Sequence, residues 1–252
     1  MSNENYLKKL FIDEAKPALQ RHSGGGGVSE AEYAQLKTHY ITILNKDEVV
    51  ITKDYFEYVD EIVDEAFSYY NNLLGVEIPE WITRIGRYAF RAATRLISVE
   101  IPDSVTHISR GVFNMASKLQ TVKIYRSANS TDNDYGYLFN ACANLQELIF
   151  TNIAVSLQVG SGNDWGHLLT VDSLVHLIYE LRDTGSSKTL TVGSANLEKL
   201  ANVYVKTVEI TDEMRAEDDL VDEKLPFVVC ESTDEGAMLI VDYAALKNWD
   251  IA

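Results

Sequence analysis

The chain contains an internal repeat with a period of 23 residues, which limits its possible folds more than any other feature. Residues 76–98 (VEIPEWITRIGRYAFRAATRLIS) align without a gap on residues 99–121 (VEIPDSVTHISRGVFNMASKLQT). Both copies begin with Val-Glu-Ile-Pro and carry a Phe fourteen residues later. A repeat of this length predicts a solenoid, in which each unit forms one coil that stacks on its neighbours.

The repeat extends to at least four units when the Phe residues are used as anchors. A Leu lies six residues after each of four Phe residues, and apolar residues lie nine and eleven residues after. The first unit is degenerate, and the last has three extra residues between its Phe and the preceding one. We predict a solenoid over residues 53–150. Its core between the coils should contain Phe67, Phe90, Phe113, Phe139, Leu73, Leu96, Leu119 and Leu145.

Each unit also predicts its own local structure. Val-Glu-Ile alternates apolar and charged residues, as a short strand does when one of its sides faces a core. Pro79 and Pro102 should end these strands, because proline cannot donate to a hydrogen-bond ladder. One coil cannot bury its apolar side alone, but four stacked coils make a continuous core.

Residues 99–124 (VEIPDSVTHISRGVFNMASKLQTVKI) resemble the BspA-like leucine-rich repeat. This resemblance is close over residues 76–124 and looser over 53–75 and 125–150. It implies a right-handed solenoid with a short parallel sheet along one face. The family often has a Cys at the third position after the Phe, which only Cys142 matches here. We interpret Cys142 as a small buried residue rather than a nucleophile or metal ligand.

The residues before the repeats divide into three parts. Residues 1–22 predict a short amphipathic helix, and the glycine-rich linker at 23–27 tethers it without fixing its position. Residues 28–52 predict an N-terminal helix that starts at a capping box of Ser29 and Glu32 and either caps the solenoid or joins copies of the chain. The first helix is either a frayed terminus or a segment that docks on another protein through Leu7, Leu10, Phe11 and Leu19.

Residues 169–200 resemble the segment that often follows these repeats in phage and prophage proteins, and residues 237–252 are similar to the end of the same proteins. We predict that residues 151–252 form a C-terminal cap, with a helix over 171–181 that begins at Thr170 or Asp172, a strand over 189–192, and a closing strand, helix and Trp over 237–252. Two added strands, at 205–210 and 226–230, should flank an acidic loop at 211–224. The expected fold class is therefore α+β: a short leucine-rich-repeat solenoid of parallel strands with N-terminal helices and a C-terminal helix–strand cap.

The formal net charge of −16 argues against a nucleic-acid partner and against docking on an anionic membrane. No apolar run reaches the roughly 20 residues of a membrane span, so we expect no membrane insertion. Residues 209–235 hold eleven acidic and two basic residues, which form either a solvated loop or a contact with a basic partner. The first 19 residues lack the pattern of a secretory signal, so we expect the chain to stay in the cytoplasm of the cell that makes it.

The sequence offers little chemistry of an enzyme. It contains no phosphate-binding loop motif, zinc-protease motif or serine-hydrolase motif, so we predict no catalytic residues, no cofactor and no metal. The glycine-rich stretch at 160–167 predicts an exposed loop rather than a phosphate site. The polar insertion at 127–137 is either a solvated loop or a receptor-binding loop, with weak resemblance to a Ca²⁺ ligand set. Its candidate receptor or glycan residues are Asp132, Asp134, Tyr135 and Tyr137.

Together, these features lead us to expect a structural component of a phage virion, such as a head or tail fibre or a decoration appendage. Its N-terminal segment would attach to capsid or tail proteins, and its repeat body would contact a host glycan or protein. Such appendages are usually symmetric, so we expect a homo-oligomer, with a trimer favoured. A BspA-type adhesin on the bacterial cell surface is the first alternative, and an enzyme without a recognisable site is the second.

Overall fold

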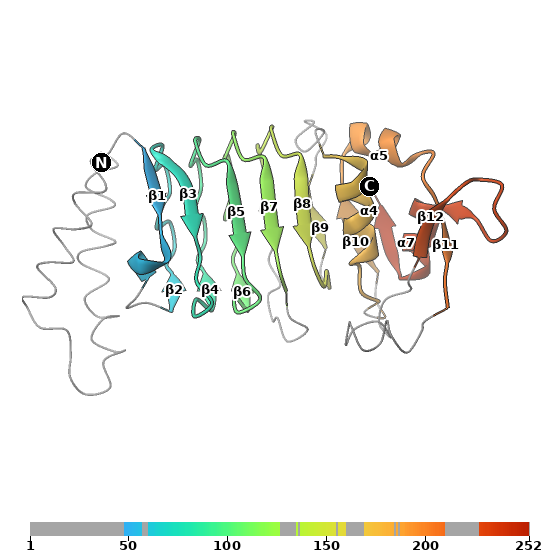
Figure 1. The fold of residues 1–252 in the computed structure, drawn as a ribbon, viewed down its shortest axis with the longest axis horizontal. Coiled ribbons are helices and arrows are strands. Elements are labelled where there is room, and N and C mark those ends of the chain that lie inside the picture. The colour runs from blue at the N-terminus through green and yellow to red at the C-terminus, as the bar shows by residue number, and fades with distance from the viewer. Residues whose placement is uncertain are drawn as a thin grey trace, which may run out of the picture.

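The computed structural model describes residues 48–56, 60–126, 135, 137–154, 156–159, 169–183, 185, 187–209 and 227–251. Its strands follow one another along one axis, as a solenoid requires (Figure 1). One parallel sheet has five strands: β1 (Val49–Ile51), β3 (Leu73–Glu77), β5 (Ser98–Ile101), β7 (Thr121–Ile124) and β8 (Glu147–Phe150). A second has three: β2 (Glu61–Ile62), β4 (Arg84–Ile85) and β6 (His107–Ile108). The predicted parallel solenoid is confirmed.

The register of the main sheet follows the sequence repeat. Val76 of β3 pairs with Val99 of β5, which pairs with Val122 of β7 and through it with Leu148 of β8. This register places equivalent apolar side chains in one row on the core side of the sheet. Pro79 and Pro102 follow β3 and β5 and accept the hydrogen bonds that turn the chain away from the sheet.

The four Phe residues form a continuous stack through the solenoid. Phe67, Phe90, Phe113 and Phe139 have successive ring centroids 5.2, 5.7 and 5.9 Å apart, and their planes lie within 9° of parallel. The structure places all eight predicted core residues in the interior, each at most 2% exposed. The stack therefore links every coil to the next through side chains as well as through backbone.

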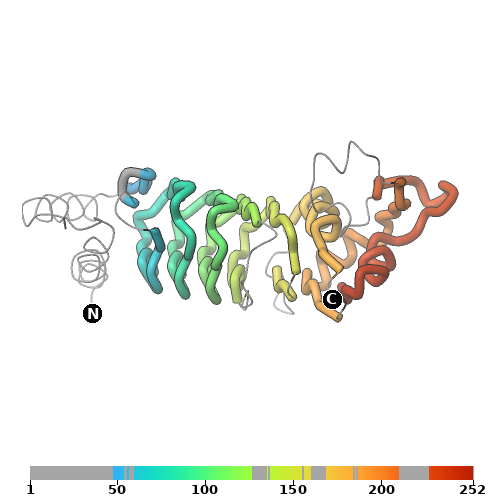
Figure 2. The backbone as a smooth tube through the Cα atoms, turned by 90° about the horizontal axis from the view of Figure 1, so that it is seen from below, coloured from blue at the N-terminus to red at the C-terminus, as the bar shows by residue number. Residues whose placement is uncertain are grey.

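Between the two sheets, each coil returns through a segment that contains left-handed residues. In the second coil these are Tyr88 and Ala92, at φ 55° and 52°, two residues on either side of Phe90. The backbone N–H groups of Tyr88, Phe90 and Ala92 donate to carbonyls of the next coil. The alternating conformation thus continues the hydrogen-bond ladder along the return segments of the coils, which stack side by side in Figure 2.

The first strand corrects one predicted boundary. β1 (Val49–Ile51) lies within residues 28–52, which the sequence predicts as a helix, and it is the edge strand of the main sheet. Its side chains alternate buried, exposed and buried, but Ile51 pairs with Val76, which is 25 residues away instead of 23. The 23-residue period of the sequence repeat therefore does not predict this strand. The anchoring residues Leu7, Leu10, Phe11 and Leu19 lie outside the described residues, as do the linker and residues 28–47.

The C-terminal cap begins with α4 (Val171–Tyr179), which packs against β8. β9 (Leu157–Gln158), β10 (Lys188–Thr191) and β14 (Trp249–Ile251) form a short parallel sheet. β11 (Tyr204–Thr207) pairs antiparallel with β12 (Phe227–Cys230) and β13 (Met238–Leu239). Two further helices, α5 (Ser194–Leu200) and α7 (Ile240–Leu246), complete the described cap. The short 3-10 helix η2 (Lys53–Phe56) lies at the other end of the solenoid, between β1 and β2.

This cap contains the helix, the strands and the closing strand–helix–Trp predicted from sequence. Thr170, rather than Asp172, caps α4, because its side chain accepts the N–H of Ser173 at 3.2 Å. The helix α5 is an addition that the sequence analysis did not predict, and the acidic loop at 211–224 lies outside the described residues. Among the residues that the structure describes, no helix has the length and hydropathy needed to span a membrane.

Candidate binding site at the end of the sheet

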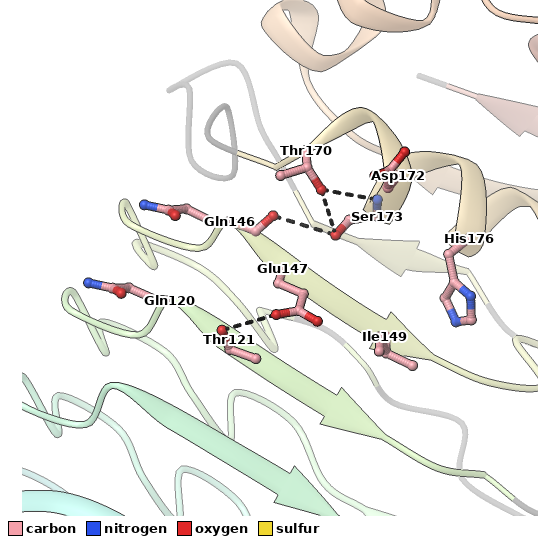
Figure 3. A pocket seen from close by; sticks show the side chains of 9 residues that line it. All are labelled: Gln120, Thr121, Gln146, Glu147, Ile149, Thr170, Asp172, Ser173 and His176. Atoms are coloured by element: carbon pink, nitrogen blue, oxygen red, sulfur yellow. Dashed lines mark hydrogen bonds between the residues drawn. The ribbon is translucent and has the colours of Figure 1, made fainter.

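The outer face of the main sheet ends in a pocket of about 450 Å³, where β7 and β8 meet α4 (Figure 3). The strands contribute one set of lining residues and the start of the helix contributes another. The lining residues are Gln120, Thr121, Gln146, Glu147, Ile149, Thr170, Asp172, Ser173 and His176. We refer to this site as the sheet-end pocket.

The helix is fixed to the last strand by the same residues that begin it. The backbone N–H of Thr170 donates to the carbonyl of Gln146 at 3.0 Å, and the N–H of Leu148 donates to Ser173 Oγ at 3.2 Å. Ser173 Oγ also lies 3.1 Å from the hydroxyl of Thr170. These bonds use the free edge of β8, which would otherwise expose unpaired backbone groups. One wall of the pocket is therefore held rigidly.

Most of the remaining lining groups are polar and accessible. The side chains of Glu147 and Asp172 are exposed, and Thr121 Oγ1 donates to Glu147 Oε2 at 3.4 Å. Gln120 and Gln146 add amide groups at the upper ends of β7 and β8, and His176 projects from α4 beside Ile149 (Figure 3). Two carboxylates with amides around them suit a ligand that donates hydrogen bonds, through hydroxyl or ammonium groups.

The hydroxyl of Ser173 in the pocket and the thiol of Cys142 in the last coil are both arranged for packing rather than for catalysis. Ser173 is 5% exposed, and its hydroxyl takes part in the cap of α4. Cys142 is 1% exposed, and its Sγ donates to the carbonyl of Phe113 at 3.1 Å. Burial raises the pKa of the Cys142 thiol to about 12, so the group is protonated at neutral pH, as its interpretation as a core residue requires. The described residues contain no group of three or more His, Cys, Asp or Glu side chains that could hold a metal.

The structure describes two of the four candidate residues of the insertion at 127–137. Asp132 and Asp134 lie outside the described residues. Tyr135 is 6% exposed and packs edge-on against Phe150 at 5.1 Å, so its ring is part of the core and not available to a sugar, which corrects the expectation of an exposed ring. Tyr137 is 46% exposed and lies under the guanidinium of Arg110, 4.5 Å from the ring centroid.

Sequence reasoning missed the sheet-end pocket because its two walls come from strands and a helix that the repeat pattern treats separately. A signal was nevertheless present. Asp172 and His176 lie four residues apart on the polar side of a helix whose Leu174, Leu177 and Ile178 are buried. A helix that caps a sheet must place that polar side beside the outer side chains of the last strand.

The comparisons with known proteins agree with the repeat found in the sequence and in the fold. Residues 52–160 match, in six copies, the family model described as the BspA type leucine-rich repeat region. No curated protein and no solved structure matches the chain. The matched range contains all the strands from β2 to β9. Over residues 52–160, the solenoid of this protein is therefore similar to the BspA type leucine-rich repeat region.

Proposed function

We propose that this protein is an adhesin-like binding protein whose repeat body presents its outer faces to a macromolecular partner. The observation that carries the proposal is the contrast between the two sides of the main sheet. On the core side, equivalent positions hold only apolar residues, as in the row of Val76, Val99, Val122 and Leu148. On the outer side, the row that runs through the same register changes in every coil, from Gly75 to Ser98, Thr121 and Glu147. Stacking fixes the first row, whereas the second is free to match a partner.

The class of fold supports a binding role in preference to a catalytic one. Leucine-rich-repeat solenoids are typical of binding and scaffold proteins, because their stacked coils make extended surfaces. A fold does not establish a function, which depends on the side chains that its surface presents. Here the sheet-end pocket supplies an acidic, hydrogen-bonding site at the end of the outer row.

A printed glycan array tests the pocket with labelled full-length protein. We expect binding to neutral or amino-sugar glycans, which bring hydroxyl and ammonium donors to Glu147 and Asp172. The double variant Glu147→Gln/Asp172→Asn should weaken this binding about tenfold, because it removes two charged acceptors. The matched control, Glu80→Gln/Asp103→Asn, removes the same charge from two exposed residues outside the strands of the main sheet and should bind as the wild type. Equal loss in both variants, or no bound glycan, would contradict the role of the pocket.

Our finer proposal is that the protein belongs to a phage particle, which its repeat-plus-cap layout and the predicted N-terminal anchor support. Quantitative mass spectrometry of the source culture, separated into virus-sized particles, washed cell envelopes and soluble extract, tests this. We expect enrichment in the particles at a fixed ratio to capsid protein, and that ratio reports the symmetry. Enrichment in envelopes would replace the virion assignment with a cell-surface adhesin. Recovery only in the soluble extract would contradict both locations.

A further inference from the structure

We propose that the return segments of the coils carry a second binding surface, which holds acidic polysaccharides by their carboxylates. This Arg–Tyr ridge consists of Tyr69, Tyr88, Arg91, Arg110 and Tyr137. It extends the proposed binding function to residues outside the sheet-end pocket and to ligands of the opposite charge. The pocket and the ridge can therefore be tested separately.

The ridge contains cation–π contacts both within one coil and between neighbouring coils. The guanidinium of Arg91 lies 5.1 Å from the ring centroid of Tyr69 and 5.3 Å from that of Tyr88. The guanidinium of Arg110 lies 4.5 Å from the ring of Tyr137. Such contacts restrict the long Arg side chains before any ligand arrives, so less conformational entropy is lost on binding.

Gly111 joins these contacts into one surface. The equivalent positions of the other coils are Glu65, Tyr88 and Tyr137, which carry side chains at similar left-handed φ angles, so the backbone does not itself require glycine. A Cβ on Gly111 would lie only 2.3 Å from Cε1 and 2.6 Å from Cδ1 of Tyr88. The missing side chain thus leaves room for the Tyr88 ring to lie across the third coil, next to Arg110.

The ridge lies in the basic part of an acidic chain. Residues 84–126 contain eight Lys or Arg and two Asp or Glu, although the whole chain has a net charge of −16. Arg84 is in ion pairs with Glu61 and Asp64, and Arg95 is in an ion pair with Glu48. Arg91 and Arg110 instead lie against neutral Tyr rings, and no carboxylate among the described residues is placed in an ion pair with them. This part of the surface should attract anions that the rest of the molecule repels.

The chemistry of the ridge favours an acidic polysaccharide over an acidic peptide. Guanidinium groups bind carboxylates through two parallel hydrogen bonds, and the half-exposed rings of Tyr69 and Tyr137 offer apolar contact. Arg91 lies in the second coil and Arg110 in the third, and neighbouring coils are about 5 Å apart. A polyuronate repeats both a carboxylate and an apolar ring face along its length. A run of acidic side chains repeats only the carboxylate.

Isothermal titration calorimetry of the full chain with polygalacturonate tests the proposal, with neutral dextran as the reference polymer. We expect binding to polygalacturonate that weakens with added salt, and none to dextran. The variant Arg91→Gln/Arg110→Gln should weaken binding about tenfold or more, since each charge-assisted contact contributes strongly. The matched control Lys118→Gln/Lys188→Gln removes the same charge elsewhere and should change the affinity less than about twofold.

Further measurements distinguish the ridge from a general charge effect and from the pocket. The variant Arg91→Lys/Arg110→Lys keeps the charge but loses the planar fork, so it should bind more weakly than the wild type while it remains folded. The pocket variant Glu147→Gln/Asp172→Asn should retain full affinity for polygalacturonate even if the pocket proves to bind nothing. If Arg91→Gln/Arg110→Gln and Lys118→Gln/Lys188→Gln lose affinity equally, the proposal is overturned. Absence of binding to polygalacturonate would overturn it too. Equally tight binding of polyglutamate would overturn the assignment to a polysaccharide.

Discussion

Replacement of Phe113 by Ala is expected to lower the free energy of unfolding by about 3–5 kcal/mol, the usual range for a fully buried aromatic residue. Phe113 is 0% exposed and stacks between Phe90 and Phe139, at centroid distances of 5.7 and 5.9 Å. Its removal leaves a cavity between two coils and interrupts the stack that links them. In a solenoid the contact between neighbouring coils carries much of the stability, so the change acts on both sides of the gap.

Urea denaturation followed by circular dichroism measures this effect, and Met115→Ala provides the control. Met115 lies two residues further along the same return segment, but its side chain is 43% exposed, so its truncation should cost less than about 0.5 kcal/mol. If the solenoid separates at the gap, the Phe113 variant should also show a broader transition with a smaller m-value. Similar losses in both variants would contradict the importance of the stack.

The sequence predicted those parts of the fold that depend on short-range spacing. The strands around Val76, Val99 and Val122 and the Phe stack follow from one periodic pattern, because every coil repeats the same local choices. β1 was missed for the same reason, since its spacing to β3 departs from the period. Tyr135 was assigned to the surface because the residues beside it in the sequence are polar, whereas the structure packs it on Phe150.

The candidate sites were less predictable because they depend on contacts between coils and on the cap. In the sheet-end pocket, Gln120 and His176 are 56 residues apart in the sequence, and they line the same pocket only because α4 packs on β8. In the Arg–Tyr ridge, Tyr88 adopts a left-handed φ that its residue type does not favour. The backbone ladder to the next coil stabilises that conformation, and Gly111 accommodates the ring. A pattern read along one chain does not contain these tertiary constraints.

Replacement of Lys247 by Met should be the second strongly destabilising change, at about 2–4 kcal/mol, because it leaves two carbonyl groups without their buried donor. Lys247 is 1% exposed, and its Nζ donates to the carbonyl of Leu181 at 2.7 Å and to that of Tyr179 at 3.2 Å. These carbonyls lie at and just beyond the C-terminus of α4, where a positive charge is also favoured by the helix dipole. Lys247 therefore joins the closing helix α7 to the helix that caps the solenoid.

The same urea titration tests this prediction against Lys206→Met. Lys206 forms a half-exposed ion pair with Asp234 at 3.5 Å, and such pairs contribute less than about 1 kcal/mol. Both variants lose one lysine charge, so net charge does not distinguish them, and a larger loss in the Lys247 variant reports the buried hydrogen bonds. Equal stability of the two variants would show that water or the remaining backbone satisfies the carbonyls of Tyr179 and Leu181, and that the cap does not depend on this lysine.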